Sequence, residues 1–498
     1  MLLAQDFSAL NVALPSIERE LDTDLTTVQW VINAYALVFA VLIVTGGRLA
    51  DEFGRQRIFL IGAGIFAVTS LLAGLAPTPI LLISTRALMG IGAALMWPAV
   101  LGMAYAVLPA DRASLAGGLV IGAAGVGQAI GPITGGALTE FLSWRWVQFV
   151  NVPLALLAMF GIWRSIPAVA IPKAGGRIDY PGIVTLSAGL FALLFALDQA
   201  TEWGWGDWRI ILSLVLAAAF MALFVVIERR TGPSALVPFD VMSSRPFAVA
   251  CVLIALIAPA FIAILLYLPQ LMEKLLNFSP LMAGIGMLPL LACFALVSFV
   301  AAPLADRLGA RIVIIAGTAM MAGGPFLLSG FAVGSSYTSL IAGMVVTDIG
   351  LGLVFPTVTT AGVTAVDASR TSLAGGIIYM FQLAGGAIGL GLTTTIVAAA
   401  AQSALRAGGS PATDLSADEL TALRGVLAGT ESSQEVLQQF PADVARRLLD
   451  SASEAFASGV QAGLRLDAGL AALALVVAVL LVRDQQRRPG EREGDAAT

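Results

Sequence analysis

Three ionisable side chains stand deep within long apolar stretches of this sequence: Asp6, Arg86 and Asp348. A charged group at the centre of a bilayer costs at least about 2.5–3.5 kcal/mol, so ionisable residues in such places favour a functional interpretation. Burial disfavours the ionised form of a carboxyl group, and a nearby cation favours it. A carboxylate that alternates between a dry pocket and water can load and release a proton. The chain has no histidine, so a proton-linked step must use carboxylates.

The composition is that of a membrane protein. Of the 498 residues, 58% are hydrophobic and 12% are charged, whereas soluble domains carry about 25% charged residues. Apolar runs of about 20 residues recur along the chain, and this length is typical of helices that cross a bilayer. The runs predict fourteen spans, near residues 1–18, 27–48, 58–76, 80–107, 113–139, 146–165, 181–200, 209–228, 247–269, 281–303, 312–332, 338–362, 372–400 and 465–483.

The basic residues predict the orientation of these spans. If the N-terminus lies in the cytoplasm, most of the arginines and lysines between spans fall in cytoplasmic loops, as the positive-inside rule requires. Trp30, Trp144 and Trp146 then lie at outer span ends, where interfacial aromatic residues gather, and so does the cluster at 203–208. We therefore expect a multi-pass protein of the cell (plasma) membrane with both termini in the cytoplasm.

Two short charged turns resemble each other. GGRLADEFGRQR at 46–57 and APLADRLGAR at 302–311 each place an Asp three residues before a Gly, with an Arg shortly after. The two aspartates lie about 255 positions apart, which indicates an internal repeat. A carboxylate at a helix N-terminus is favourable by about 0.3–1 kcal/mol. We therefore interpret the turns as a conformational latch that breaks as two halves rock, made of Gly47, Asp51, Gly54, Arg55, Arg57, Asp306 and Arg311.

Two further pairs of segments support the repeat. IGAALMWPA at 91–99 and RASLAGGL at 112–119 match IGLGLVFPT at 349–357 and RTSLAGGI at 370–377. The predicted domains are a six-helix half at 1–165, an inserted helix pair at 181–228, a second six-helix half at 247–483 and a cytoplasmic tail at 484–498. The second half contains an extracytoplasmic segment at about 401–464, in which Pro441 is suited to open a helix and 416–419 has capping-box spacing.

The charged turns resemble the signature loop of the major facilitator superfamily, whose two parallel six-helix halves bind substrate between them. Fourteen spans are similar to its drug:proton antiporter family. QDFSALNVALPSI at 5–17, WRWVQFVNVP at 144–153 and LPQLMEKLLNFSPLMAGIGMLP at 268–289 resemble further motifs of that family. The sequence departs from the family pattern at Ser8, where the family most often has Thr, and at Ala302, where the first turn has Gly.

The resemblance implies that Asp6, Arg86 and Asp348 face a central cavity and take part in proton coupling, because the first and fourth helices of each half line it. Arg86 with Gly90 matches the family's R-x-x-x-G pattern. The alternatives are a structural hydrogen bond for Asp6 and a structural role for Arg86. For Asp348, the choice between contacting substrate and contacting a proton stays open.

The fifth apolar run, at 117–136, is rich in glycine and contains a Gly-Pro pair. Gly127, Gly131 and Gly135 are four residues apart, so they share one helical face that a partner helix can approach closely. Pro132 frees a backbone carbonyl and permits a bend. Together with Gly136, these residues resemble the antiporter motif of proton-coupled exporters. The alternative is a small-residue packing face without a role in transport.

Other polar residues within the spans are candidates for the substrate cavity or for interhelical hydrogen bonds. They are Asn33, Tyr35, Gln128, Tyr267, Gln270, Tyr379 and Gln382.

The resulting hypothesis is a proton-coupled exporter of hydrophobic, cationic compounds, and not an enzyme. Its partners are the lipid bilayer, a small-molecule substrate and protons. There is no ATP-binding G-x-x-x-x-G-K-[ST] loop and no basic patch for nucleic acid, and we expect no cofactor or metal. The alternatives are a dedicated exporter of an endogenous metabolite or lipid, or a sensor or scaffold that does not transport.

The first span is short on its inner side. Five residues precede Asp6, which is about 7.5 Å of helix, whereas half a membrane needs about 15 Å. This predicts that the natural product starts upstream of Met1, the alternative being a short first helix shielded by its neighbours.

Overall fold

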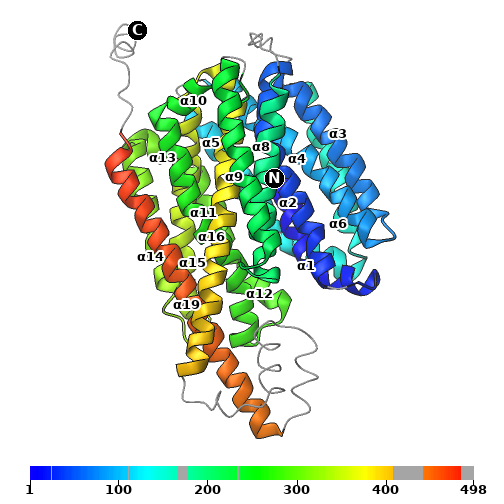
Figure 1. Cartoon of the computed structure of the whole chain (residues 1–498), viewed down its shortest axis with the longest axis vertical. Coiled ribbons are helices and arrows are strands. Elements are labelled where there is room, and N and C mark those ends of the chain that lie inside the picture. Colours follow the sequence, from blue (N-terminus) through cyan, green and yellow to red (C-terminus); the bar gives the residue numbers. More distant parts are fainter. Residues whose placement is uncertain (24, 110–111, 166–177, 233–234, 408–440, 484–498) are drawn as a thin grey trace.

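The computed structural model describes residues 1–23, 25–109, 112–165, 178–232, 235–407 and 441–483. Within these ranges the regular elements are helices, most of them roughly aligned with the long axis of the molecule (Figure 1). Thirteen of the described helices are long and apolar enough to cross a membrane. These findings confirm the predicted all-α membrane fold.

The N-terminal helices form one group. They are α1 (Leu2–Glu20), α2 (Leu25–Phe53), α3 (Arg55–Gly74), α4 (Pro79–Val107), α5 (Ala113–Phe141) and a broken pair, α6 (Arg145–Phe149) and α7 (Asn151–Ser165). Both α2 and α3 pack on α4, α1 packs on α5, and α7 packs on α3. Helix α1, which carries Asp6 and the charged run 18–20, is not one of the thirteen, so its place in the membrane stays a prediction.

The C-terminal helices form a second group. They are α10 (Phe239–Ser243), α11 (Arg245–Leu276), α12 (Pro280–Gly286), α13 (Leu288–Leu308), α14 (Ala310–Leu328), α15 (Thr338–Val363), the short 3-10 helix η3 (Ala368–Arg370), α16 (Thr371–Ala407) and α19 (Ala442–Leu481). Helix α15 packs on α13 and α14, and α16 packs on α11 and α19. The two groups meet through α5 with α13 and through α2 with α16.

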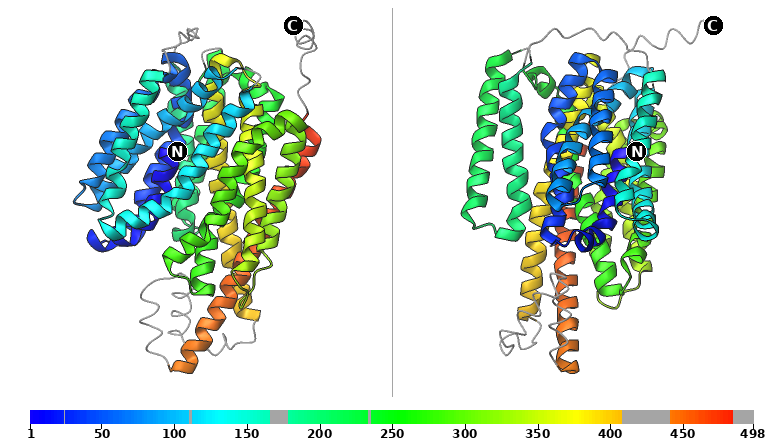
Figure 2. Two further views of the ribbon diagram at one scale, coloured as in Figure 1. Left: turned by 180° about the vertical axis from the view of Figure 1, so that it is seen from behind. Right: turned by 90° about the vertical axis from the view of Figure 1, so that its right-hand side faces the viewer.

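A helical hairpin stands beside these two groups. It consists of α8 (Tyr180–Trp203) and α9 (Trp208–Thr231), which pack on each other and lie at the side of the molecule (Figure 2). Asp179 caps α8 by accepting a hydrogen bond from the Gly182 amide. Helix α8 contacts both α2 and α16, so the hairpin lies at the boundary between the two groups, beside the contact of α2 with α16. Most side chains of the apolar α9 are not buried, as expected for a helix that faces lipid.

The two charged turns have the same backbone design. Gly54 separates α2 from α3 with φ 102°, and Gly309 separates α13 from α14 with φ 88°. A side chain is disfavoured at such angles, so glycine is the residue suited to both positions. This explains the Asp-x-x-Gly spacing in each turn, because the preceding helix must stop at the glycine.

Three details differ from the sequence-based expectations or extend them. Helix α19 starts at Ala442, directly after Pro441 as predicted, and is much longer than the predicted span 465–483. Helices α16 and α19 both run beyond the other helices into the predicted 401–464 segment (Figure 1). Residues 408–440, which include 416–419, and the tail at 484–498 lie outside the described residues.

Trp144 is buried, with the Arg145 guanidinium over its ring, so this residue does not belong to an interfacial belt.

Candidate functional site

Asp6 and Arg86 form an ion pair inside the N-terminal group. Arg86 Nη1 on α4 lies 2.7 Å from Asp6 Oδ2 on α1, and both side chains have zero exposure. Removing one partner of such a pair leaves an uncompensated buried charge, which costs about 3–5 kcal/mol. Asp6 and Arg86 were each predicted from their depth in an apolar run. In the structure they form one buried ion pair.

A set of buried polar residues supports this ion pair. Asn151, at the start of α7, donates its amide to Asp6 Oδ1 at 2.7 Å and to Ser70 Oγ at 3.1 Å. Ser70 in turn donates to the backbone carbonyl of Gln148 at 2.8 Å. Sequence reasoning did not identify these three residues as part of the site. The sequence motif at 144–153, which contains both Gln148 and Asn151, could have pointed to two of them.

The guanidinium of Arg86 also connects α4 to α2. Its Nε donates to the Val31 carbonyl at 3.1 Å, and its carbon lies 4.4 Å from the centre of the Tyr35 ring. A cation over an aromatic face gains about 2 kcal/mol or more when desolvated. Tyr35 therefore helps to hold the cation, which is a more specific role than the cavity lining expected for it.

A second acidic residue, Asp348, is buried in the C-terminal group of helices. Its side chain on α15 has zero exposure, and neither carboxylate oxygen has a hydrogen-bond partner among the described residues. Burying an isolated ionised carboxylate is very costly. Asp6, Arg86 and Asp348 were all expected to face a cavity, but in this conformation all three are enclosed by packed helices.

Asp51 joins the end of α2 to the start of α16. Its two oxygens accept from the backbone amides of Ser372 at 3.3 Å and Leu373 at 2.8 Å, which are in the first turn of α16. The first amides of a helix have no partner within the helix, so a carboxylate there satisfies them and complements the helix dipole. Gly47 allows this approach, because a Cβ at this position would lie 2.7 Å from the Ser372 carbonyl oxygen.

Arg55 links the same contact to two further segments. It lies 3.0 Å from Asp51 Oδ1 and donates to the carbonyls of Gly102 at 2.9 Å and Ala368 at 2.8 Å. The segment before α16 is itself ordered by Asp367, which accepts from the Ser369 hydroxyl and amide; these two hydrogen bonds lower the pKa of Asp367. Asp51 and Arg55, two residues of the predicted latch, thus lie in a buried contact between the two groups of helices. Their role as a latch stays a prediction.

The second charged turn makes a lighter contact. Asp306, at the end of α13, accepts from Ser114 Oγ on α5 at 2.9 Å; Asp306 is exposed and Ser114 is half-buried. Arg311 donates to the Val479 carbonyl on α19 at 3.1 Å, and Arg57 in the first turn is exposed. Each turn therefore reaches the start of a helix in the other group, but the first turn alone does so from a buried site.

The contact at Asp51 leads to a prediction about the end of the molecule that carries the charged turns. Asp51→Asn replaces charge-assisted hydrogen bonds, worth about 1.5–3 kcal/mol each, with weaker ones. We expect this end to open, so the distance between spin labels at Phe53 and Thr364 broadens and lengthens in a background without the native cysteines. The exposed Asp306→Asn is the matched control and should change this distance less. An equal response to both substitutions would show that burial of Asp51 does not matter.

Glycines of α5 form the surface on which α1 packs. A Cβ at Gly127 would overlap the Met1 backbone, at Gly131 the Ser8 hydroxyl, and at Gly135 the Ala9 backbone. Gly136 has room, since a Cβ there would lie 3.7 Å from Val12. Pro132 lies within α5, one residue beyond Gly131. The partner of the predicted glycine face is therefore the helix that carries Asp6.

Two of the predicted cavity residues lie in contacts between helices. Asn33 connects α2 to α8, and Tyr379 connects α16 to α2 and α4. Asn33 on α2 donates to Asp198 on α8 at 2.8 Å. Tyr379 on α16 packs against Phe39 and Trp97, with ring centres 5.4 and 4.7 Å away. Asp198 was missed because it stands beside the predicted end of its span at 200, whereas α8 continues to Trp203.

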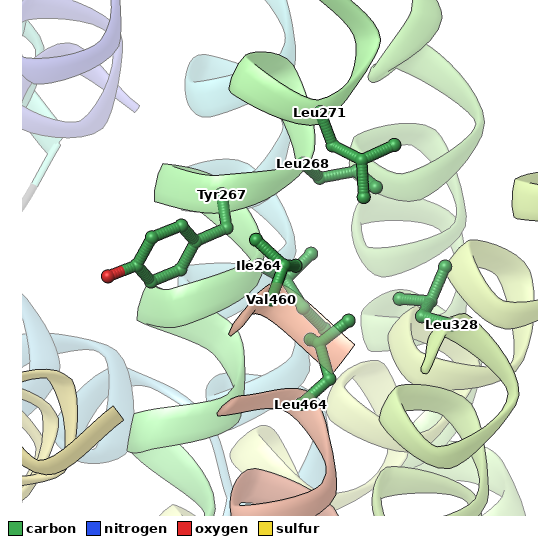
Figure 3. Close-up of a pocket in the computed structure, with 7 residues that line it drawn as sticks. All are labelled: Ile264, Tyr267, Leu268, Leu271, Leu328, Val460 and Leu464. Atoms are coloured by element: carbon green, nitrogen blue, oxygen red, sulfur yellow. The ribbon is translucent and has the colours of Figure 1, made fainter. Parts of the chain in front are cut away.

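The remaining cavity candidates are not brought together. Tyr267 donates to Thr394 at 2.8 Å and borders a small apolar pocket with six aliphatic residues from α11, α14 and α19 (Figure 3). Gln270 bonds to the Leu266 carbonyl one turn earlier in its own helix. Gln128 and Gln382 are half-buried on α5 and α16. The pocket therefore contains one of the seven predicted cavity residues.

Comparison with known proteins identifies the family. Residues 1–390 match the Major Facilitator Superfamily. A puromycin resistance protein of Streptomyces alboniger is 35% identical over 80% of this chain and 79% of its own. A cephamycin export protein of Amycolatopsis lactamdurans is 35% identical over 79% of this chain and 82% of its own. A tetracenomycin C resistance and export protein of Streptomyces glaucescens is 31% identical over 80% and 74%.

A solved structure shows the same fold. The human organic anion transporter MFSD10 (TETRAN) superposes with a TM-score of 0.60 over 96% of this chain and 97% of its own, at 13% sequence identity. The chain belongs to the Major Facilitator Superfamily of membrane transporters, and it is not an enzyme.

Proposed function

We propose that this protein is a proton-coupled exporter of hydrophobic, cationic compounds that works by alternating access. Its relatives are named for resistance to, or export of, single antibiotics, and one at 31% identity is a multidrug resistance protein of Mycobacterium tuberculosis. In this proposal the protein lies in the cell membrane with both termini in the cytoplasm. Residues 1–165 and 247–483 form the two moving halves, 181–228 the inserted pair and 484–498 a cytoplasmic tail.

The observation that carries the proposal is the fully buried Asp6–Arg86 pair. Asp6 can exchange its interaction with Arg86 for a proton, and the exchange changes the hydrogen bonds that tie α1 to α4 and α7. Because α1 also packs on the glycine face of α5, a change at Asp6 reaches a helix that contacts the C-terminal group through α13. Protonation from outside thereby favours one orientation of the halves.

Asp348 supplies the second element, a place for positive charge in the C-terminal group. Its two oxygens lack a hydrogen-bond partner among the described residues, so either a proton or a cationic substrate would satisfy them. A carboxylate that binds a proton or a cation, but not both, produces exchange by simple competition. This would deliver drug outward as a proton moves inward.

Asp348→Asn should therefore change which compounds are exported. Because the amide carries no charge, we expect export of monovalent and divalent cationic drugs to fall more than export of neutral drugs of similar size. Efflux rates for paired compounds, measured at equal protein abundance, test this. Asp348→Glu keeps the charge and should retain the preference for cations. An equal loss for charged and neutral compounds in Asp348→Asn would assign Asp348 to coupling or folding instead.

A drug-efflux panel in cells, with and without a protonophore, tests the function itself. We expect accumulation of several hydrophobic cations to fall when the protein is expressed and to recover when the protonophore is added. Export confined to a single compound would favour a dedicated exporter of a metabolite or lipid on the same fold. Absence of efflux for every compound would favour a sensor or scaffold.

A further inference from the structure

Three consecutive threonines on α16 each contact a different part of the molecule. Thr393 donates to Asp467 on α19 at 2.8 Å, Thr394 accepts from Tyr267 on α11 at 2.8 Å, and Thr395 accepts from Trp205 in the α8–α9 turn at 2.9 Å. Successive residues on a helix point about 100° apart, because a turn contains 3.6 residues. Three different neighbours therefore form hydrogen bonds with α16 within a single turn of the helix.

One of these contacts contains a buried acid that the proposed mechanism does not use. The Asp467 side chain has zero exposure, and its Oδ2 has no hydrogen-bond partner among the described residues. Sequence reasoning missed it because the last span was placed at 465–483, which put Asp467 at its edge. Since α19 begins at Ala442, Asp467 lies well inside the helix.

The charged and titratable groups around Asp467 bear on whether it can be ionised here. In the part of the chain that the structure describes, Asp467 takes part in none of the ion pairs. The helices packed on α19 are α11, α14 and α16. On α11, Tyr267 interacts electrostatically with Asp467, and the Lys274 ammonium lies over the Phe456 ring of α19, about 16 Å along the helix from Asp467. Arg465 on α19 is exposed, and Arg311 binds α19 at Val479, about 18 Å along the helix from Asp467.

Close packing of α19 on α16 leaves little space for water near this acid. A Cβ at Gly459 would lie 2.6 Å from the Val397 carbonyl oxygen, and a Cβ at Gly463 would lie 2.9 Å from the Thr393 methyl group. An ionised carboxylate without a counter-ion or water is very costly, whereas a protonated one can stay in a dry contact. An ionised Asp467 would therefore be very costly in the packing shown here.

We propose that Asp467 is a further proton-binding site of the transport cycle, besides Asp6 and Asp348, protonated in this conformation and ionised when α19 and α16 move apart. This rests on the proposed function, because it assigns a further proton to the same exchange. The proton comes from water and binds Oδ2, and it returns to water when the contact opens. Asp6 differs, because Arg86 pairs with it.

Infrared difference spectroscopy of the full-length protein in lipid tests this directly. We expect a protonated-carboxyl band that disappears in Asp467→Asn, an isosteric substitution that keeps the Thr393 contact. Thr393→Val retains the acid but removes its hydrogen bond, so the same band should remain and shift. A band pattern in Asp467→Asn identical to that of the unsubstituted protein, or no shift in Thr393→Val, would overturn the proposal.

Transport stoichiometry provides the second readout. In proteoliposomes, Asp467→Asn should lower the number of protons exchanged per drug molecule by one, while drug movement down its own gradient continues. An unchanged ratio would also overturn the proposal. If the unsubstituted protein exchanges no protons, the proposed function fails, and the infrared band then shows separately whether Asp467 is protonated.

Discussion

Asp6→Asn is expected to abolish proton-driven drug transport in a protein that still inserts into the membrane. Asp6 accepts hydrogen bonds on both oxygens, from Arg86 and from Asn151. An amide offers one acceptor oxygen, so one of these two donors loses its acceptor. The substitution also leaves the Arg86 guanidinium as a buried charge without a counter-ion, at a cost of about 3–5 kcal/mol.

A double variant separates coupling from folding. Arg86→Gln added to Asp6→Asn removes the uncompensated charge, so part of the lost stability should return while coupling stays absent. Thermal unfolding in detergent and pH-gradient-driven uptake in proteoliposomes measure the two effects. Normal gradient-dependent transport by Asp6→Asn would remove Asp6 from the mechanism. Recovery of coupling in the double variant would show that stability alone had been lost.

Gly131→Leu is expected to stop transport by forcing α1 away from α5. Any side chain at this position overlaps the Ser8 hydroxyl, and its Cβ would lie 3.0 Å from the Ala9 amide. Overpacking of this kind costs about 1–3 kcal/mol. The displaced helix carries Asp6, so we expect the Asp6–Arg86 geometry to be lost together with transport, while drug binding persists.

Gly64→Leu on α3 is the size-matched control. A Cβ at Gly64 would meet no heavy atom within 4 Å, so the same added side chain should leave transport near the unsubstituted level. Drug binding and uptake should be measured on both variants at equal abundance. Full transport by Gly131→Leu would contradict the packing account, and loss in both variants would point to a general effect of bulk in the spans.

Much of the fold was predictable because each apolar run forms a helix whatever it packs against. The runs near 80–107, 113–139 and 338–362 agree with α4, α5 and α15 to within a few residues. The run near 27–48 stopped five residues before the end of α2 at Phe53, where Gly54 at φ 102° interrupts the helix. Such features depend on nearby residues alone.

The partners within the site were harder to predict because they depend on how distant helices meet. Asn151 reaches Asp6 across 145 positions of sequence, and Asp51 reaches Leu373 across 322. The sequence identified one member of each contact from its charge and depth, but nothing in hydropathy identifies the other. Asp198 and Asp467 were missed because their helices run past the apolar runs that suggested them.

The most direct test of the account is drug movement driven by an imposed pH gradient in proteoliposomes of the purified protein, without ATP. We predict that a hydrophobic cation moves against its own concentration gradient while protons move the opposite way. A protonophore should stop both movements, and Asp6→Asn should show neither. Uphill drug movement that is insensitive to the pH gradient, or drug movement that stays strictly downhill, would contradict proton-coupled export.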